Sequence, residues 1–184
     1  MIQKSGQNLQ KKGQLKYLIN FAKYFMPPSN PNSLHLLYNR PGFLLRRAHQ
    51  ISISIFEQEC QSIKLTPVQY GILTALHTLP GIDQTHLARK LGLDKVTTLR
   101  VLRDLERRSL ITRSEHPSDK RSYSLTLSSH GQILLKESQK HVNAAYTKLA
   151  SGLTESEFMY LLKLLKKFNS SLDTHARTSF HPTE

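Results

Sequence analysis

The chain has 184 residues, enough for one domain with a hydrophobic core, and its composition is strongly basic. Its 26 Lys and Arg against 13 Asp and Glu give a formal net charge of +13, which favours a polyanionic partner, either nucleic acid or an acidic membrane surface. A single cysteine excludes an internal disulfide framework and suits a reducing cytoplasm, and no stretch approaches the roughly 18 apolar residues of a membrane span. The first residues also lack the order of basic, apolar and small side chains that marks a signal peptide.

Residues 1–33 are expected to form a basic N-terminal extension. Residues 1–56 contain eight Lys and Arg and no acidic residue. Within the extension, residues 15–26 form a short basic amphipathic stretch that ends at a pair of prolines. Such a helix would pack on the body or on a partner subunit, or lie on a membrane surface. Met26 is a second candidate for the first residue of the chain.

A long helix is expected from about residue 34 to 62, within an N-terminal dimerisation arm at 34–64. Its apolar residues lie on two faces, and a helix that is apolar on two faces is buried on two sides. The second side is therefore expected to contact another subunit. The first face carries Leu44, Ala48, Ile51 and Ile55, and the second carries Leu45, Phe56, Cys60 and Ile63.

Residues 65–128 carry the pattern of a winged helix-turn-helix. A helix opens at Thr66-Pro67, because proline favours the first helical position, and ends near Pro80. In the following stretch, 84–102, Leu87 and Leu91 share one buried face, and Gly92 permits the left-handed turn between two helices. An ordinary helical hairpin is the simpler alternative, but a basic helix and a basic hairpin follow.

The second helix of this motif is expected at 94–108, with Asp94 as its N-cap. Alternating residues then predict strands at 110–114 and 123–127 around a polar turn at 115–122. Helices at 129–150 and from the capping box Thr154/Glu157 onward form C-terminal dimerisation helices at 129–172, followed by a flexible tail at 173–184. The fold class is therefore mainly α with a small β-hairpin wing and helical arms at both ends. We expect the last two helices to bury Ile133, Leu134, Leu135, Val142, Ala145, Tyr146 and Leu149, and then Phe158, Leu161, Leu162, Leu165 and Phe168.

Several stretches in this order resemble the MarR family of bacterial transcription regulators: LLRRAHQ (44–50), LTPVQYGILTAL (65–76), QTHLARKLGLDKVTTLRVLRDLERRSLITR (84–113), HPSDKRSYSLTLSSHGQILL (116–135) and LTESEFMYLLKLLKKF (153–168). The resemblance implies an obligate homodimer that binds double-stranded DNA at a palindromic operator and usually represses. It also implies release from DNA by a small aromatic acid bound between the arms and the DNA-reading lobe. Residues 40–50 and 67–76 look most like members that control the degradation of aromatic acids. Ser109 stands where the family usually has Gly, and Thr98 where an apolar residue often packs inward.

The second helix of the motif is expected to meet the bases with its N-terminal half. Arg100 is the best candidate for base readout, because its planar fork can pair with a guanine edge, and Thr97 could touch a thymine methyl or a phosphate. Lys95 and Arg103 are expected to bind phosphate, with Val96 on the same outward face. Alternatively, these arginines pair with Asp104 or Glu106 and only solvate the helix.

The wing also carries candidates for DNA binding. Asp119 and Arg121, with Lys120 between them, match the family's Asp-x-Arg signature. The resemblance implies that the acid orients the wing and that the arginine enters the minor groove, where a narrow A·T-rich tract attracts guanidinium. A plain turn with a surface ion pair is the alternative.

The effector site is predicted on the first two arm-side helices, at Arg46, Arg47, His49, Tyr70 and His77. A carboxylate ligand needs a cation and hydrogen-bond donors, which Arg or His together with Tyr would supply. The alternative is that Arg46 and Arg47 face solvent or DNA phosphates and that His77 is a core residue.

Other functions find less support in the sequence. Cys60 could act as a thiol redox switch, but Glu57 and Glu59 disfavour a thiolate and its face is apolar, so a small buried hydrophobe is the preferred interpretation. No metal-binding histidine pair at i, i+4, phosphate-binding glycine loop or nucleophile motif occurs, so we expect no metal, no cofactor and no catalysis. A ligand-independent architectural DNA-binding protein is a further alternative, which would bind all sequences alike.

Overall fold

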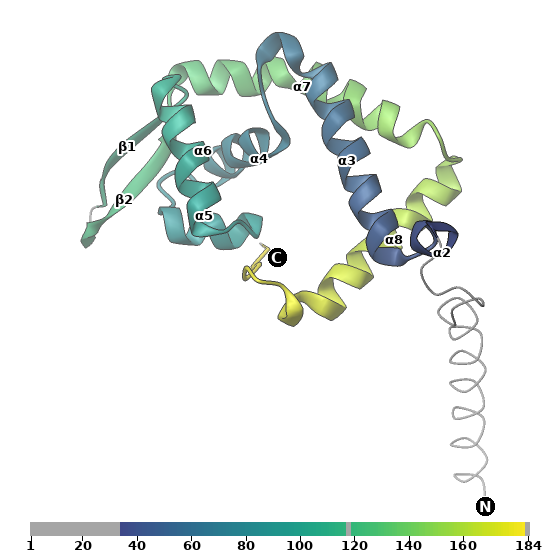
Figure 1. Cartoon of the computed structure of the whole chain (residues 1–184). Coiled ribbons are helices and arrows are strands. Elements are labelled where there is room, and N and C mark those ends of the chain that lie inside the picture. The colour runs from purple at the N-terminus through teal and green to yellow at the C-terminus, as the bar shows by residue number, and fades with distance from the viewer. Residues whose placement is uncertain (1–33, 117–118, 183–184) are drawn as a thin grey trace, which may run out of the picture. The chain divides into compact units, whose positions relative to one another are not determined.

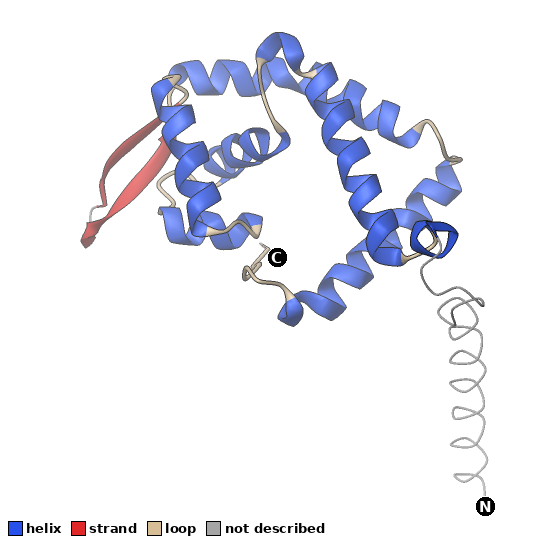
Figure 2. Cartoon of the chain, in the orientation of Figure 1, coloured by secondary structure: helices blue, strands red, loops and turns tan. Residues whose placement is uncertain are grey.

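The computed structural model describes residues 34–116 and 119–182, with the side chains of residues 116–122 left outside the description. The predicted extension at 1–33, with its 15–26 stretch and Met26, therefore lies outside the described residues. The described chain is mainly helical with one two-stranded sheet, which confirms the predicted fold class (Figures 1 and 2). No helix of this part of the chain is long and apolar enough to cross a membrane.

The elements are α2 (Leu34–Tyr38), α3 (Pro41–Glu59), a 3-10 turn (Gln61–Ile63), α4 (Pro67–Thr78), α5 (Gln84–Leu91), α6 (Lys95–Arg107), β1 (Ile111–His116), β2 (Asp119–Leu127), α7 (Ser129–Ala150), α8 (Glu155–Leu172) and a second 3-10 turn (Asp173–His175).

The chain forms two compact units, with the boundary between Ile51 and Ser52, inside α3. In the first unit, the prediction of one helix over 34–62 is wrong. The helix is interrupted at Asn39 and Arg40, because Pro41 donates no N–H and restricts the residue before it. The C-terminal end is also earlier than predicted, since α3 stops at Glu59 and the chain turns at Lys64, whose φ is 51°.

The core of the second unit lies where α4, α5 and α6 pack against β2 and α7 (Figure 1). Thr66 and Gln69 form a reciprocal capping box that starts α4, with Pro67 at the first helical position as predicted. Gly92 ends α5 with a φ of 62°, which confirms the predicted left-handed turn. The fully buried side chains include Ile72, Leu73, Leu76, Leu87, Thr98, Leu102, Leu105, Leu110, Leu125 and Val142.

The wing is longer than the sequence predicted. Strand β1 pairs antiparallel with β2 from Ile111 opposite Leu127 to His116 opposite Asp119, so the predicted polar turn at 115–122 belongs largely to the strands. The hairpin is anchored to the segment before α5, because Gly81 N–H donates to Leu125 O and Leu125 N–H donates to Ile82 O, at 2.9 and 3.1 Å. These bonds fix the base of the wing beside the helix-turn-helix.

The turn between α6 and β1 packs directly on the start of α7. Ser109 has a φ of 54°, as expected for a position that usually needs glycine. The hydroxyl of Ser128 donates to Ser109 O at 2.7 Å and also accepts the N–H of Gly131, so the same side chain caps α7. A side chain on Gly131 would overlap the carbonyl oxygen of Leu110 and lie 3.0 Å from its carbonyl carbon.

The apolar face of α8 is not fully covered by the described residues, so the prediction that it is buried is wrong for this part of the chain. Helix α8 has no buried residue: of the five residues predicted to be buried, Leu161 and Phe168 are 39% and 47% exposed, and Phe158, Leu162 and Leu165 are half-buried. Helix α7 is buried at Leu135, Val142 and Ala145 as predicted, but Ile133 and Tyr146 are exposed. On α3, Leu44, Leu45 and Ile51 are exposed as well.

We predict that Gly131→Ala destabilises the fold by about 3 kcal/mol or more, because backbone atoms must move to admit the methyl group. Urea denaturation at fixed protein concentration measures the change. Gly152→Ala is the control, since nothing lies within 4 Å of that position, and it should shift stability by less than about 0.5 kcal/mol. Equal midpoints for the two variants would contradict the predicted backbone contact.

Candidate nucleic-acid interface

Both helices of the helix-turn-helix begin at an aspartate that caps them. Asp83 accepts the N–H groups of Thr85 and His86 at 2.7 and 3.0 Å. Burial raises the pKa of the Asp83 carboxyl, but the hydrogen bonds from His86 and Thr85 outweigh it, so the pKa lies below its ordinary value. Asp94 accepts both the N–H and the hydroxyl of Thr97, which lowers the pKa of Asp94. The predicted N-cap at Asp94 is confirmed.

Helix α6 presents a cationic outer face. Lys95, Arg100 and Arg103 are exposed and Val96 is 77% exposed, as expected for the outward set. Thr97 is half-buried, and its hydroxyl donates to the Asp94 carboxylate at 2.7 Å. On the opposite side, Thr98 is fully buried and donates its hydroxyl to Asp94 O at 2.7 Å, so the polar group is satisfied within the core.

The acidic residues of α6 pair with other cations. Asp104 forms ion pairs with Arg107 and Arg108 and accepts the side-chain amide of Gln69 at 2.8 Å. Glu106 lies 3.4 Å from Nε of Arg113 on the wing. Among the described residues, Arg100 and Arg103 form no ion pair, so the alternative that Asp104 or Glu106 neutralises them finds no support. Their charge remains available to an anionic partner.

The wing candidates lie on β2. Asp119, Lys120 and Arg121 open this strand next to the tip of the hairpin, and their side chains are outside the description. Nearer the body, the Arg113 guanidinium lies 5.1 Å from the centre of the Tyr123 ring, a cation–π contact across the hairpin. The ion pair between Arg113 and Glu106 joins the wing to α6.

The predicted effector residues fall on different elements. Arg46, Arg47 and His49 are exposed on the part of α3 that belongs to the first unit, where Arg46 stacks on Phe43 and donates to Gln50 at 3.2 Å. In the second unit, Tyr70 lines a cleft of about 400 Å³ between α4, α5 and α7. His77 is exposed on α4 outside this cleft, so it is not the core residue that the alternative supposed.

Sequence reasoning missed most of the cleft lining. Its polar members are Tyr70, Thr74, Thr78, Lys90 and Tyr146, from three helices. Partial desolvation of the Tyr146 phenol, together with Tyr70 and Cys60, raises its pKa above the ordinary value of 10.0. The phenol of Tyr70 accepts from the Gln139 amide at 3.2 Å. Only the helical spacing of Tyr70 and Thr74 could have pointed to this surface.

Cys60 is fully buried in the core, as the preferred interpretation expected. Burial and the neighbouring Glu59 raise the pKa of its thiol, which disfavours the reactive thiolate that a redox switch needs. Within the described residues, no group of three His, Cys, Asp or Glu side chains could hold a metal ion.

Comparison with known proteins agrees with this geometry. Residues 65–123, which span the helix-turn-helix and most of the wing, match the MarR family. A protein of Thauera aromatica assigned as a transcriptional regulatory protein for the hcr operon is 31% identical over 130 residues, which cover 68% of this chain and 76% of that protein. The chain belongs to the MarR family. It is a DNA-binding transcription regulator with a winged helix-turn-helix, and not an enzyme.

Two solved structures extend the comparison. The transcriptional repressor CouR, bound to a 23-mer DNA duplex, is 30% identical with a TM-score of 0.69, over 74% of this chain and 96% of CouR. Bordetella bronchiseptica BpsR, whose DNA binding is regulated by 6-hydroxynicotinic acid, is 30% identical with a TM-score of 0.65, over 70% of this chain and 97% of BpsR.

We predict that acid lowers the stability of the fold partly by protonating Asp83 and Asp94, which cap α5 and α6. A carboxylate with a lowered folded pKa stabilises the protein above its unfolded value of 3.8, and this contribution is lost as the pH falls through the folded pKa. Asp94→Asn keeps a capping oxygen without a titrating charge. Between about pH 6 and about pH 3, its melting temperature should therefore fall less than that of the wild type.

Thermal unfolding followed by circular dichroism makes this comparison. Glu137→Gln is the control, because Glu137 is exposed on α7 and forms no ion pair within the described part of the chain. It should follow the wild-type curve. Parallel curves for Asp94→Asn and wild type would show that the Asp94 cap does not contribute to acid sensitivity.

Proposed function

We propose that the protein is a cytoplasmic homodimeric repressor that binds a palindromic operator and is released from it by a small aromatic acid. The observation that carries the proposal is the outer face of α6, where Lys95, Arg100 and Arg103 are exposed and unpaired within the described residues while the acids of the same helix are neutralised. Arg100 would read base edges, and Lys95 and Arg103 would bind phosphates, with Thr97 and Val96 at the same surface. Asp119, Lys120 and Arg121 would place the wing on the flanking minor groove.

The exposed apolar faces of α7 and α8 support the homodimer. A soluble domain rarely leaves so many large apolar side chains in water, and such a surface marks an interaction site. Met159, Tyr160, Leu161, Leu164 and Phe168 lie on one helix, so a second copy could cover them with the same surface about a twofold axis. Two copies of α6 would then face half-sites about one helical turn apart.

The cleft beside Tyr70 supports an aromatic-acid effector. Its volume of about 400 Å³ lies in the range of small-molecule sites, and Leu91 and Ala75 supply apolar walls. Lys90 is the cation that would pair with a carboxylate, and the Tyr70 and Tyr146 phenols are the donors. In the relative BpsR, DNA binding is regulated by 6-hydroxynicotinic acid, which is a small aromatic acid. A contribution of Arg46, Arg47 and His49 would require α3 to approach the same ligand.

We predict that selection from a pool of random duplexes enriches inverted repeats whose half-sites are centred about 10 bp apart. On the selected duplex, Arg100→Ala should weaken binding at least about 10-fold, since a bidentate base contact contributes roughly 1–3 kcal/mol of discrimination. On a mixed-sequence duplex, the same variant should lose much less. Fluorescence anisotropy at fixed salt measures both affinities.

Arg107→Ala is the matched control, because it removes the same charge from the same helix at a residue paired with Asp104. This variant should bind both duplexes slightly less tightly than the wild type, with the same loss of affinity for each. If Arg100→Ala also acted equally on both duplexes, or if selection enriched no sequence, the architectural alternative would replace the proposed function.

We predict that a benzoate-like, cinnamate-like or pyridine carboxylate compound raises the melting temperature of the wild type, because it binds only the native cleft. Lys90→Met should abolish this shift, and Tyr70→Phe should reduce it. Lys140→Met on α7, an exposed lysine outside the cleft, should retain it, as should His77→Ala. A shift that survives Lys90→Met would place the effector elsewhere.

A further inference from the structure

The C-terminal segment 176–182, within the stretch 173–184 that the sequence predicted to be a flexible tail, packs on the turn between α5 and α6. Thr178 donates its hydroxyl to Gly92 O at 2.9 Å, and His181 N–H donates to Arg89 O at 2.9 Å. The Phe180 ring lies against Gly92, within 3.6–3.9 Å of where a Cβ would stand. Three of four consecutive tail residues therefore contact one helix end.

These contacts complete the C-terminus of α5. The last carbonyl groups of a helix have no partner within it, and tail atoms supply donors to two of them, at Arg89 and Gly92. Phe180 covers the exposed backbone at Gly92, where the φ of 62° favours a residue without a side chain. The helix-turn-helix and the wing are together called the reading head. The tail is thus held at a fixed place on the reading head by hydrogen bonds and apolar contact.

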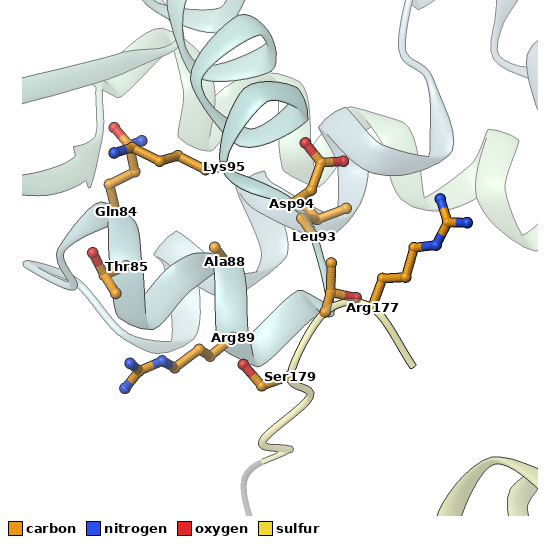
Figure 3. Close-up of a pocket in the computed structure, with 10 residues that line it drawn as sticks. Gln84, Thr85, Ala88, Arg89, Leu93, Asp94, Lys95, Arg177 and Ser179 are labelled. Atoms are coloured by element: carbon orange, nitrogen blue, oxygen red, sulfur yellow. The ribbon is translucent and has the colours of Figure 1, made fainter. Parts of the chain in front are cut away.

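The docked tail forms one side of an open cleft of about 490 Å³ that runs along α5 to the N-terminal end of α6. Gln84 and Thr85 begin α5, Lys95 begins α6, and Arg177 and Ser179 come from the tail (Figure 3). In Figure 3, Arg177 extends to the side opposite Arg89 and Lys95, so cations flank the cleft on both sides. None of these three side chains forms an ion pair within the described residues, and Asp94 is the one acid that lines the cleft.

We propose that the docked tail is a further DNA-contacting element, and that Arg177 binds a phosphate of the strand beside the groove entered by α6. This inference rests on the proposed function, because it needs α6 at the duplex. In a helix-turn-helix, the N-terminal residues of the second helix meet the bases, so a cleft lined by Asp94 and Lys95 opens near the flanking backbone, and Arg177 stands on the far side of that same cleft. An arginine at this place contributes affinity without sequence preference.

The position of Arg177 depends on the anchor at Gly92, and this dependence separates the proposal from a general effect of charge. Phe180→Ala changes no charge but removes the apolar contact that holds the tail. It should therefore reproduce the loss caused by Arg177→Ala. Lys140→Ala removes one positive charge from an exposed site on α7 and is the matched control.

The test measures binding of the full chain to the selected duplex and to a mixed-sequence duplex, by anisotropy over a range of salt concentrations. Arg177→Ala should weaken both about five-fold at about 0.1 M salt and lower the slope of log affinity against log salt by about 0.9 per subunit. Phe180→Ala should match it. Arg177→Lys should retain the slope, and Lys140→Ala should change affinity less than about two-fold.

Other outcomes would overturn the proposal. If Arg177→Ala behaves like Lys140→Ala, the tail does not touch DNA. If Phe180→Ala binds more tightly than wild type, the docked tail hinders binding instead. Failure of the proposed function would look different, because the wild type would then not distinguish the selected duplex from the mixed one, whatever the tail variants do.

Discussion

The close approach of Gly131 to Leu110 is the constraint on which the reading head depends. Because no side chain separates them, the start of α7 rests on the backbone that links α6 to β1. The hydroxyl of Ser128 bonds both Ser109 O and Gly131 N–H, so the last turn of the reading helix, the base of the wing and the first turn of α7 form one joint. Any rotation of α7 must move α6 with it, since interiors this closely packed transmit displacement rather than absorb it.

The second determinant is how charge is divided around α6. Helix α6 carries both basic and acidic side chains, but its two acids form ion pairs with other arginines. Asp104 pairs with Arg107 and Arg108, and Glu106 pairs with Arg113. Arg108 also donates to Lys64 O at 2.9 Å, which joins the end of α6 to the loop before α4. The structural arginines thereby neutralise the acids, and the positive field of Lys95, Arg100 and Arg103 is left undiminished on the outer face.

Local features of this protein could be predicted from the sequence, and features set by distant contacts could not. The cap at Asp94, the turn at Gly92 and the inward Thr98 each depend on a few neighbouring residues. The break before Pro41 is equally local, but the apolar pattern continues across it and therefore predicts one uninterrupted helix. By contrast, Lys90 and Tyr146 line one cleft from positions 56 residues apart, and nothing in their local sequence indicates it. Burial of α8 failed as a prediction because its apolar pattern describes a surface that the residues from 34 to 182 which the structure describes do not cover.

Helix α5 lies between the two clefts of the reading head. Arg89 lines the cleft beside the tail, whereas Lys90 and Leu91 line the cleft beside Tyr70, and the tail itself reaches both, through Arg177 to Ser179 and through Pro182. A ligand changes DNA affinity only if it binds the DNA-competent and incompetent states differently, and a 100-fold loss needs about 2.7 kcal/mol of such coupling. A ligand beside Lys90 would therefore need to favour a different position of α5. Because α5 is short and held at one end by Asp83 and at the other by the tail, a small shift of this helix would alter both clefts and the start of α6 together.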